Sequence, residues 1–277
     1  MKNSVETLPI FLRWAGGKKW LIPHLENIIG DTKFNNYHEP FLGSGAIYFA
    51  ISSDKNAYLS DLNEELINTF LVVKNFPLRL FAALSFFKNS KEFYYYIRNK
   101  EYKNPIFQAA RFIFLNQTSY NGLYRVNKLG KYNVPYGNRK NINIKLEKIV
   151  EASKKLKNTE ISFGNFDVNK DLIKANDLVF LDPPYTVSHN NNGFIEYNKN
   201  LFSLNDQYRL KDFIEYISEK GAYYILTNAA HETIYSIFSK NAKVIELKRN
   251  SLIGGKNAKR EKIAEYIFTN INREVKL

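Results

Sequence analysis

Residues 177–185, with the sequence DLVFLDPPY, carry the sharpest signal in the chain. A short apolar run in this stretch is bounded by polar residues and predicts a buried strand over 177–181. Asp182 ends the strand, two prolines stop it and stiffen the turn, and Tyr185 follows at once. The pattern places a carboxylate and an aromatic ring just beyond the end of a buried strand.

Short strands and helical patterns alternate on both sides of this stretch. Strand, helix and strand at these lengths predict an α/β fold, with a mostly parallel sheet and helices on both of its faces. The expected strands span residues 36–39, 57–60, 160–163, 177–181, 222–227, 243–247 and 264–269, and the expected helices span 46–52, 64–74, 204–218 and 232–239.

Residues 76–157 break the alternation and are predicted to be an insertion. Helices are expected over 78–87, 91–99 and 106–116, followed by a hairpin-like segment rich in Gly and Asn and by one more helix. We therefore expect residues 1–75 and 158–277 to form one domain, built around the sheet, and residues 76–157 to form a second, inserted domain. The polar segment 186–200 is expected to be a mobile loop beside a site.

The charge of the chain is concentrated in the same insertion. The sequence has 40 Lys and Arg against 27 Asp and Glu, a net charge of +13, and residues 88–157 hold 16 basic but only 4 acidic groups. The lysines of 145–157 favour a solvated amphipathic helix with Ile149 and Leu156 inward. In 111–140 the cations alternate with Tyr, Asn and Gly, which is typical of a surface that meets phosphates and base edges.

Composition excludes several classes of protein. With no cysteine, the chain forms no disulfide, thiolate metal site or cysteine nucleophile, and its four histidines lack metal-ligand spacing, so we expect no metal. Apolar runs are too short to span a membrane, and the N-terminal residues lack a signal-peptide core. These features predict a soluble, cytoplasmic protein.

A glycine turn and an acidic residue mark two further strand ends. Glu39 to Gly45 follows one strand and precedes a helix, and its glycines allow a tight turn and a close approach to a ligand. Tyr48 replaces the third glycine of the dinucleotide fingerprint, which disfavours a pyrophosphate cofactor and leaves a plain turn open. Asp61 ends the next strand, where doubly wound sheets place an acid for ribose hydroxyls, although a helix N-cap fits it as well.

Residues 11–20, FLRWAGGKKW, resemble a phosphate loop but lack the Ser or Thr after the lysine. Trp14 and Lys18 flank the glycine turn, so an aromatic wall and a cation would face a small ligand. A surface turn with a half-buried tryptophan is the alternative.

The residues after the central strand suit an exocyclic amine. Asp182 and the carbonyl of Pro183 supply acceptors for its two hydrogens, and Tyr185 supplies a face on which the ring stacks. A proline-terminated strand with a capping aspartate is the alternative reading.

Residues 112–138 are the candidate reader of nucleic acid. Arg125 has the fork that pairs with guanine, Tyr120 is suited to stack or wedge between bases, and Leu123 and Pro135 offer apolar contacts to a thymine methyl. The alternative is an exposed Tyr-rich hairpin with structural Asn-Gly turns.

Taken together, these motifs resemble the Dam family, the alpha group of DNA adenine-N6 methyltransferases, and occur in the order of that family. The resemblance implies that residues 1–75 and 158–277 form a catalytic, cofactor-binding domain with a Rossmann-like methyltransferase sheet, and that residues 76–157 form a mostly helical DNA-binding domain with a β-hairpin. It also implies transfer of a methyl group from S-adenosylmethionine to a flipped adenine in duplex DNA. It implies catalytic roles for Asp182, Pro183 and Tyr185, and cofactor binding by Trp14, Lys18, Glu39, Phe41, Gly43, Gly45, Asp61 and Asp182. It implies DNA binding by Arg13, Tyr120, Asn121, Leu123, Arg125, Asn127, Asn133, Pro135 and Arg139, with Arg13 reaching the first guanine.

The resemblance also sets expectations for the target and partners. Family members with this hairpin read GATC or a longer site that contains GAT, but here Asn138-Arg139-Lys140 departs from the family's Gly-Arg-Tyr pattern. Cytosine C5 methylation needs a cysteine, and the cytosine N4 class more often has Ser at the position of Asp182, so adenine is favoured. We expect a monomer, with a restriction endonuclease acting on the same site as a further partner.

Two other function classes remain open at this point. Related tetrapeptides serve RNA and protein amine methyltransferases, and the basic block alone would suffice for a DNA-binding protein without catalysis.

Overall fold

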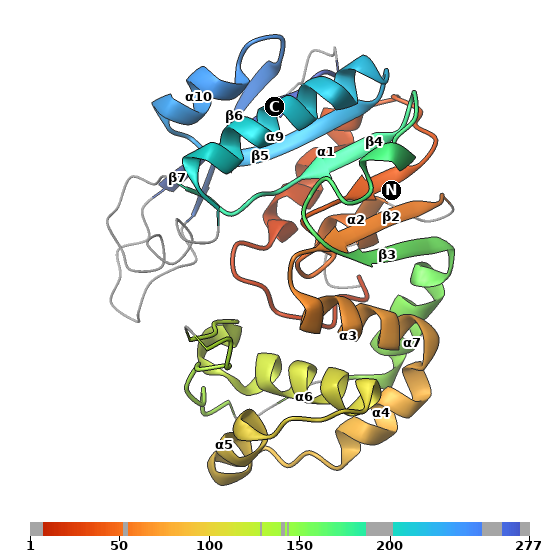
Figure 1. The fold of residues 1–277 in the computed structure, drawn as a ribbon, viewed down its shortest axis with the longest axis vertical. Coiled ribbons are helices and arrows are strands. Elements are labelled where there is room, and N and C mark those ends of the chain that lie inside the picture. The colour runs from red at the N-terminus through yellow and green to blue at the C-terminus, as the bar shows by residue number, and fades with distance from the viewer. Residues whose placement is uncertain are drawn as a thin grey trace. The chain divides into compact units, whose positions relative to one another are not determined.

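The structure, a computed structural model, describes residues 8–51, 55–127, 129–139, 142, 144–186, 202–250 and 262–271. Its strands are β1 (Tyr37–Glu39), β2 (Ala57–Asp61), β3 (Thr159–Phe163), β4 (Leu178–Leu181), β5 (Tyr223–Ala229), β6 (Lys243–Asn250) and β7 (Lys262–Thr269). They form a seven-stranded sheet in the order β3-β2-β1-β4-β5-β7-β6 (Figure 1). The first five follow the 3-2-1-4-5 order of doubly wound nucleotide-binding sheets, which confirms the predicted α/β class.

The helices agree with the predicted pattern to within a few residues at each end. They are α1 (Ile22–Ile29), α2 (Ala46–Ile51), α3 (Glu64–Asn75), α4 (Pro77–Ser85), α5 (Lys91–Asn99), α6 (Pro105–Thr118), α7 (Leu146–Lys155), α9 (Leu204–Glu219) and α10 (Glu232–Phe238), with 3-10 turns η2 (Lys18–Leu21), η3 (Tyr120–Gly122), η4 (Leu156–Asn158) and η5 (Lys170–Leu172). The short helix α1 was not predicted.

The chain divides into two compact units. The first comprises Met1–Ile22 and Leu42–Val168, and the second comprises Pro23–Phe41 and Asn169–Leu277. The inserted segment 76–157 lies within the first unit. Its separation as a DNA-binding domain stays a prediction.

The second unit holds most of the strands. β1 pairs parallel with β4, β4 pairs parallel with β5, and β7 joins β5 and β6 by antiparallel ladders. All four residues of β4 are buried, as expected for a strand flanked on both sides by partners. Because β1 and β4 run in the same direction, their carboxyl ends meet at one edge of the sheet.

The first unit combines the parallel pair β2 and β3 with the inserted helices. β2 matches β3 from Ala57 opposite Thr159 to Asp61 opposite Phe163. Asn63 caps α3 by accepting a hydrogen bond from the backbone of Leu66 at 3.0 Å, and α6 contributes a buried run that includes Phe112. α6 belongs to the insertion, whereas α3 immediately precedes it.

Among residues 119–127 and 129–136, the predicted hairpin-like segment has two isolated antiparallel bridges, one between Ser119 and Tyr136 and one between Val126 and Tyr132. The segment begins with the turn η3 after α6, and individual backbone hydrogen bonds hold it. The predicted loop at 186–200 falls outside the described residues, apart from Thr186.

No single helix in the described ranges is long and apolar enough to cross a membrane. The pair α3 and α4, bent by 113°, meets that test only jointly and by length and composition alone.

Candidate active site

Asp182 lies directly beyond β4 and is fixed by the neighbouring strand. The hydroxyl of Thr227 in β5 donates a hydrogen bond of 2.8 Å to Oδ1 of Asp182. Thr227 is fully buried, and the register that pairs Leu181 with Leu226 brings it beside the end of β4. The half-buried carboxylate is therefore held in one orientation at the edge of the sheet.

Tyr185 and Thr186 are fixed by two further elements. The Tyr185 hydroxyl donates a hydrogen bond of 2.5 Å to Glu265, which is fully buried in β7. Gln207 of α9 donates to the hydroxyl of Thr186 at 2.7 Å and accepts from Asn228 of β5 at 3.1 Å. The tetrapeptide 182–185 is thus tied to β5 and β7, and Thr186 directly after it is tied to α9, which preorganises this turn.

Glu39 and Phe41 leave the same sheet edge from β1. Glu39 is buried and accepts a hydrogen bond of 2.8 Å from the Tyr37 hydroxyl. Phe41 is half-buried and meets Phe202 edge-on, with 5.9 Å between ring centroids. In doubly wound sheets this edge, where the strand order reverses, is the place at which ligands bind.

Asp61 in the first unit organises the glycine turn. Its Oδ2 accepts a hydrogen bond from the backbone N–H of Gly43, and its Oδ1 accepts one from Asn63, both at 3.0 Å. Burial raises the pKa of Asp61 to about 6, while the N–H groups of Gly43, Asn63 and Leu62 oppose the shift. Asn63, not Asp61, caps α3, so the alternative reading of Asp61 as a helix cap is wrong.

Glycine is required at positions 43 and 45 of the turn for two different physical reasons. Gly43 has a left-handed φ of 49°, and a Cβ there would lie 2.8 Å from Cδ1 of Trp14. Only glycine lets the backbone lie against the indole. Gly45 also has a positive φ. A Cβ at this position would lie 3.3 Å from the rings of Phe49 and Phe70, so tight packing in the core explains the glycine here.

Trp14 links this turn to the inserted segment. Its indole stacks on Tyr124, with 5.9 Å between centroids and 20° between planes, and it also contacts Phe112 at 6.5 Å. Lys18 is buried, and its ammonium donates a hydrogen bond of 2.9 Å to the carbonyl of Gly16. The structure therefore brings together Trp14, Gly43 and Asp61 around one turn.

The predicted reader of nucleic acid presents several exposed side chains. Tyr120 is half-exposed at 50%, and its backbone N–H is held by the carbonyl of Pro135 at 2.9 Å. Asn121 follows in a left-handed conformation with φ of 53°. Arg125 is exposed and uses Nε to donate to Oδ1 of Asn133 at 2.8 Å. This hydrogen bond orients the two terminal nitrogens of the Arg125 guanidinium.

Asn127 has a structural task in the same segment. Its Oδ1 accepts hydrogen bonds from the backbones of Leu129 and Lys131, each at 3.0 Å, and this closes the turn. Leu123 is half-buried, and its carbonyl accepts a hydrogen bond of 2.6 Å from Tyr132.

Arg13 lies against the beginning of this segment. Asn116 of α6 accepts from its backbone N–H at 2.8 Å and donates to its carbonyl at 2.6 Å. A Cβ on Gly122 would come within 2.9 Å of the Arg13 side chain, so the arginine stem packs directly on that turn. Arg139 lies close enough to lower the pKa of Arg13, an effect second to burial.

Four residues that hold the site were not predicted from the sequence: Asn116, Gln207, Thr227 and Glu265. Each is a polar side chain that is at least 98% buried. A charged or polar residue within an otherwise apolar strand or helix is the signal that marks such positions, because buried polar groups need partners. Among the described residues, no three His, Asp or Glu side chains form a cluster suited to a metal ion.

Comparison with known proteins identifies the family. Residues 14–253 match the family described as D12 class N6 adenine-specific DNA methyltransferase. The chain belongs to this family. It is therefore an adenine-specific DNA methyltransferase. The match begins at Trp14 and runs past the tetrapeptide at 182–185.

Relatives of similar length support this assignment. The chain is 35% identical to the type II methyltransferase M1.LlaDCHI of Lactococcus lactis subsp. cremoris, over 97% of both chains. It is 36% identical to the type II methyltransferase M.MjaIII of Methanocaldococcus jannaschii, over 91% of this chain and 94% of the relative. It is 29% identical to the DNA adenine methylase of Escherichia coli strain K12, over 93% of each.

Proposed function

We propose that the enzyme methylates an adenine that is swung out of duplex DNA, within GATC or a longer site containing GAT, and that Asp182 to Tyr185 receive the flipped base. The observation that carries this proposal is the fixed corner after β4, in which Thr227 orients Asp182 and Glu265 orients Tyr185. A preorganised acceptor costs no reorganisation when the amine reacts.

The corner has the chemistry that adenine N6 requires. Asp182 and the carbonyl of Pro183 accept the two N6 hydrogens, which draws the nitrogen lone pair out of conjugation and fixes its direction. The half-buried Tyr185 stacks its ring on the base, which contributes roughly 1–3 kcal/mol. Extrusion costs a few kcal/mol, so contacts with the opened duplex contribute the remainder.

The first unit supplies residues that suit the nucleoside part of S-adenosylmethionine. The Asp61 carboxylate has about four lone-pair sites and interacts with the backbone N–H groups of Gly43, Asn63 and Leu62, which leaves one site for a ribose hydroxyl. Trp14 offers an aromatic wall beside Gly43. With Lys18, Glu39, Phe41 and Gly45, these are the residues that we assign to the cofactor. When bound, the cofactor supplies an electrophilic methyl group on a sulfonium.

We assign target recognition to the segment around Tyr120 and Arg125. Arg125, oriented by Asn133, pairs with a guanine through its terminal nitrogens. The other residues assigned to DNA contact are Arg13, Asn121, Leu123, Asn127, Pro135 and Arg139.

We further propose that the enzyme acts as a monomer in the cytoplasm and protects a site that a companion restriction endonuclease cuts. Two of its relatives are named type II methyltransferases, which supports this biological role.

Base flipping and target choice are tested on short duplexes. Fluorescence of 2-aminopurine at the target adenine should rise on binding, whereas 2-aminopurine one position away should change little. Labelled methyl transfer should fall when any base of GAT is replaced, and excess RNA should not compete. Transfer without a fluorescence rise would contradict flipping, and transfer independent of the GAT bases would contradict the proposed site.

A further inference from the structure

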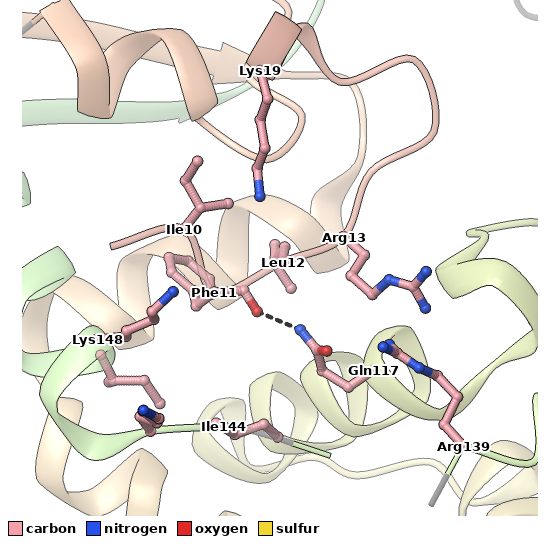
Figure 2. A pocket seen from close by; sticks show the side chains of 11 residues that line it. Ile10, Phe11, Leu12, Arg13, Lys19, Gln117, Arg139, Ile144 and Lys148 are labelled. Atoms are coloured by element: carbon pink, nitrogen blue, oxygen red, sulfur yellow. Dashed lines mark hydrogen bonds between the residues drawn. The ribbon is translucent and has the colours of Figure 1, made fainter. Parts of the chain in front are cut away.

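A cavity of about 260 Å³ in the first unit is lined by five cationic side chains (Figure 2). They are Arg13, Lys19, Arg139, Lys145 and Lys148, and no lining residue is acidic. We propose that this pocket binds one phosphate group of the DNA backbone beside the segment that reads the target. The proposal rests on the proposed function in that duplex DNA is the substrate, and it adds a phosphate site that includes Lys19, Lys145 and Lys148.

The cations come from separate parts of the chain and lie close enough to affect one another. Lys19 lies in η2, Lys148 lies on α7, and Arg139 follows the recognition segment. The pKa of Lys19 is lowered first by burial, then by Lys148 and Arg13, although the residue as a whole stays exposed. The fold therefore holds like charges together at a cost in free energy, which an oxyanion among them would offset.

The position of Arg13 in this cluster is fixed by the fold. Its backbone is held on both sides by Asn116, and Gln117 of the same helix donates a hydrogen bond of 2.8 Å to the carbonyl of Phe11. In Figure 2 its guanidinium lies beside that of Arg139, and Lys19 extends down from η2. A rigid cluster of donors is what a phosphate site requires, because phosphate offers several acceptor oxygens at once.

One donor of the cluster has no partner within the described protein. Nη1 of Arg13 is buried and makes no hydrogen bond to any described residue. Buried donors in proteins are nearly always paired, so this unsatisfied donor adds to the uncompensated positive charge of the cluster.

The location of the pocket favours a DNA phosphate over a free anion. The stem of Arg13 packs on Gly122, in the same turn as the half-exposed Tyr120. A strand whose bases meet this turn carries its phosphates a few ångströms away. The lysines of residues 145–157 were predicted to lie on a solvated helix face, and two of them, Lys145 and Lys148, line this pocket.

The first experiment measures duplex affinity against salt concentration with the full chain. Lys19→Gln and Lys148→Gln should each weaken binding several-fold, by the same factor on target and altered duplexes. The paired variant should reduce the slope of log affinity against log salt by roughly 1, the value expected for one phosphate. The matched control is Lys154→Gln, an exposed lysine of α7 outside the pocket, which should leave the slope unchanged.

The second experiment locates the phosphate. Neutral methylphosphonate groups are placed one at a time along the target duplex. At one position, or two adjacent ones, the substitution should weaken the wild-type complex several-fold and have no further effect on the Lys19→Gln/Lys148→Gln variant. Equal losses in both proteins at every position would overturn the proposal.

Adding inorganic phosphate alone tests whether the pocket binds a free anion instead of a DNA phosphate. Millimolar phosphate that stabilises the wild type but not the paired variant, with unchanged duplex affinity in that variant, would assign the pocket to a free anion and overturn the DNA assignment. The proposed function is tested by a separate measurement. If the wild type transfers no labelled methyl group to duplex DNA, the proposed function fails, whatever the result for the pocket. Calorimetry with S-adenosylmethionine checks that each variant is folded.

Discussion

The hydroxyl of Tyr185 donates a hydrogen bond of 2.5 Å to Glu265, a carboxylate that is fully buried in β7 and 80 residues away in the sequence. This bond ties the proposed stacking ring to β7, in the antiparallel part of the sheet. Tyr185→Phe should lower the free energy of unfolding by about 1.5–3 kcal/mol, the contribution of a hydrogen bond to a charged group. It should also slow transfer, because the ring loses its fixed orientation.

Chemical denaturation and single-turnover transfer measure the two effects. The matched control is Tyr235→Phe, which removes the hydroxyl of an exposed tyrosine and should alter neither quantity. Glu265→Gln keeps an acceptor for Tyr185 and should retain more activity than Tyr185→Phe. If Tyr185→Phe transfers methyl groups as fast as the wild type, the bond has no role in positioning the ring.

Thr227 is predicted to be a positioning residue for Asp182. Thr227→Val keeps the shape but removes the donor to Oδ1, so the carboxylate loses its fixed direction. Transfer should fall by roughly ten- to a hundredfold, with little change in the affinity for S-adenosylmethionine. Thr227→Ser restores the hydroxyl and should recover most of the rate, whereas equal losses in both variants would indicate a packing effect instead.

Cofactor binding should weaken below about pH 6. Burial raises the pKa of Asp61 to about 6, so its carboxylate becomes protonated as the pH falls from about 7 to about 5 and loses acceptor capacity for a ribose hydroxyl. Calorimetry should show the affinity for S-adenosylmethionine falling across this range. Asp61→Asn should bind weakly throughout and lose this pH dependence.

Protonation of Asp61 does not unfold the protein, so unfolding does not explain the expected loss of affinity for S-adenosylmethionine at low pH. The folded pKa of Asp61 lies above that of the unfolded chain, so protonation favours the folded state as the pH drops from about 6 to about 4. An affinity that is constant down to about pH 4.5 would show that Asp61 does not bind the cofactor through its ionised form.

Arg125 is predicted to discriminate one guanine of the target. Arg125→Ala should reduce discrimination at that base by roughly 1–3 kcal/mol, and Arg125→Lys should not restore it, because lysine lacks the planar fork. Transfer rates on duplexes with single substitutions provide the measurement. Lys131→Gln, an exposed cation of the same segment, should weaken all duplexes alike. Unchanged base preference in Arg125→Ala would remove it from target reading.

Local patterns in the sequence were enough to predict the strands and their class. Apolar runs bounded by turn residues mark β4 and β5, and the predicted strands lie within three residues of the observed ends. The helix α1 was missed because Pro23 and a short apolar pattern resemble a turn. These are local properties, which a single sequence records directly.

Contacts between distant residues were not predictable in the same way. Glu265 partners Tyr185 and Asn116 holds Arg13 across 80 and 103 positions, and no local pattern specifies such pairs. Similarly, amphipathicity placed Ile149 in the core but did not indicate that Lys148, on the same helix, would meet cations from other elements. Residue types marked the strand ends, while the supporting contacts required the fold.

Mapping of methylated bases tests the central claim most directly. DNA from cells that express the wild type, and from cells that express Asp182→Ala at equal levels, is sequenced for N6-methyladenine and N4-methylcytosine. The proposed function predicts N6-methyladenine within a single motif containing GAT in the wild type and none in the variant. Methylation that persists in Asp182→Ala, or that falls on cytosine, would contradict the assignment of Asp182 as the group that grips adenine N6.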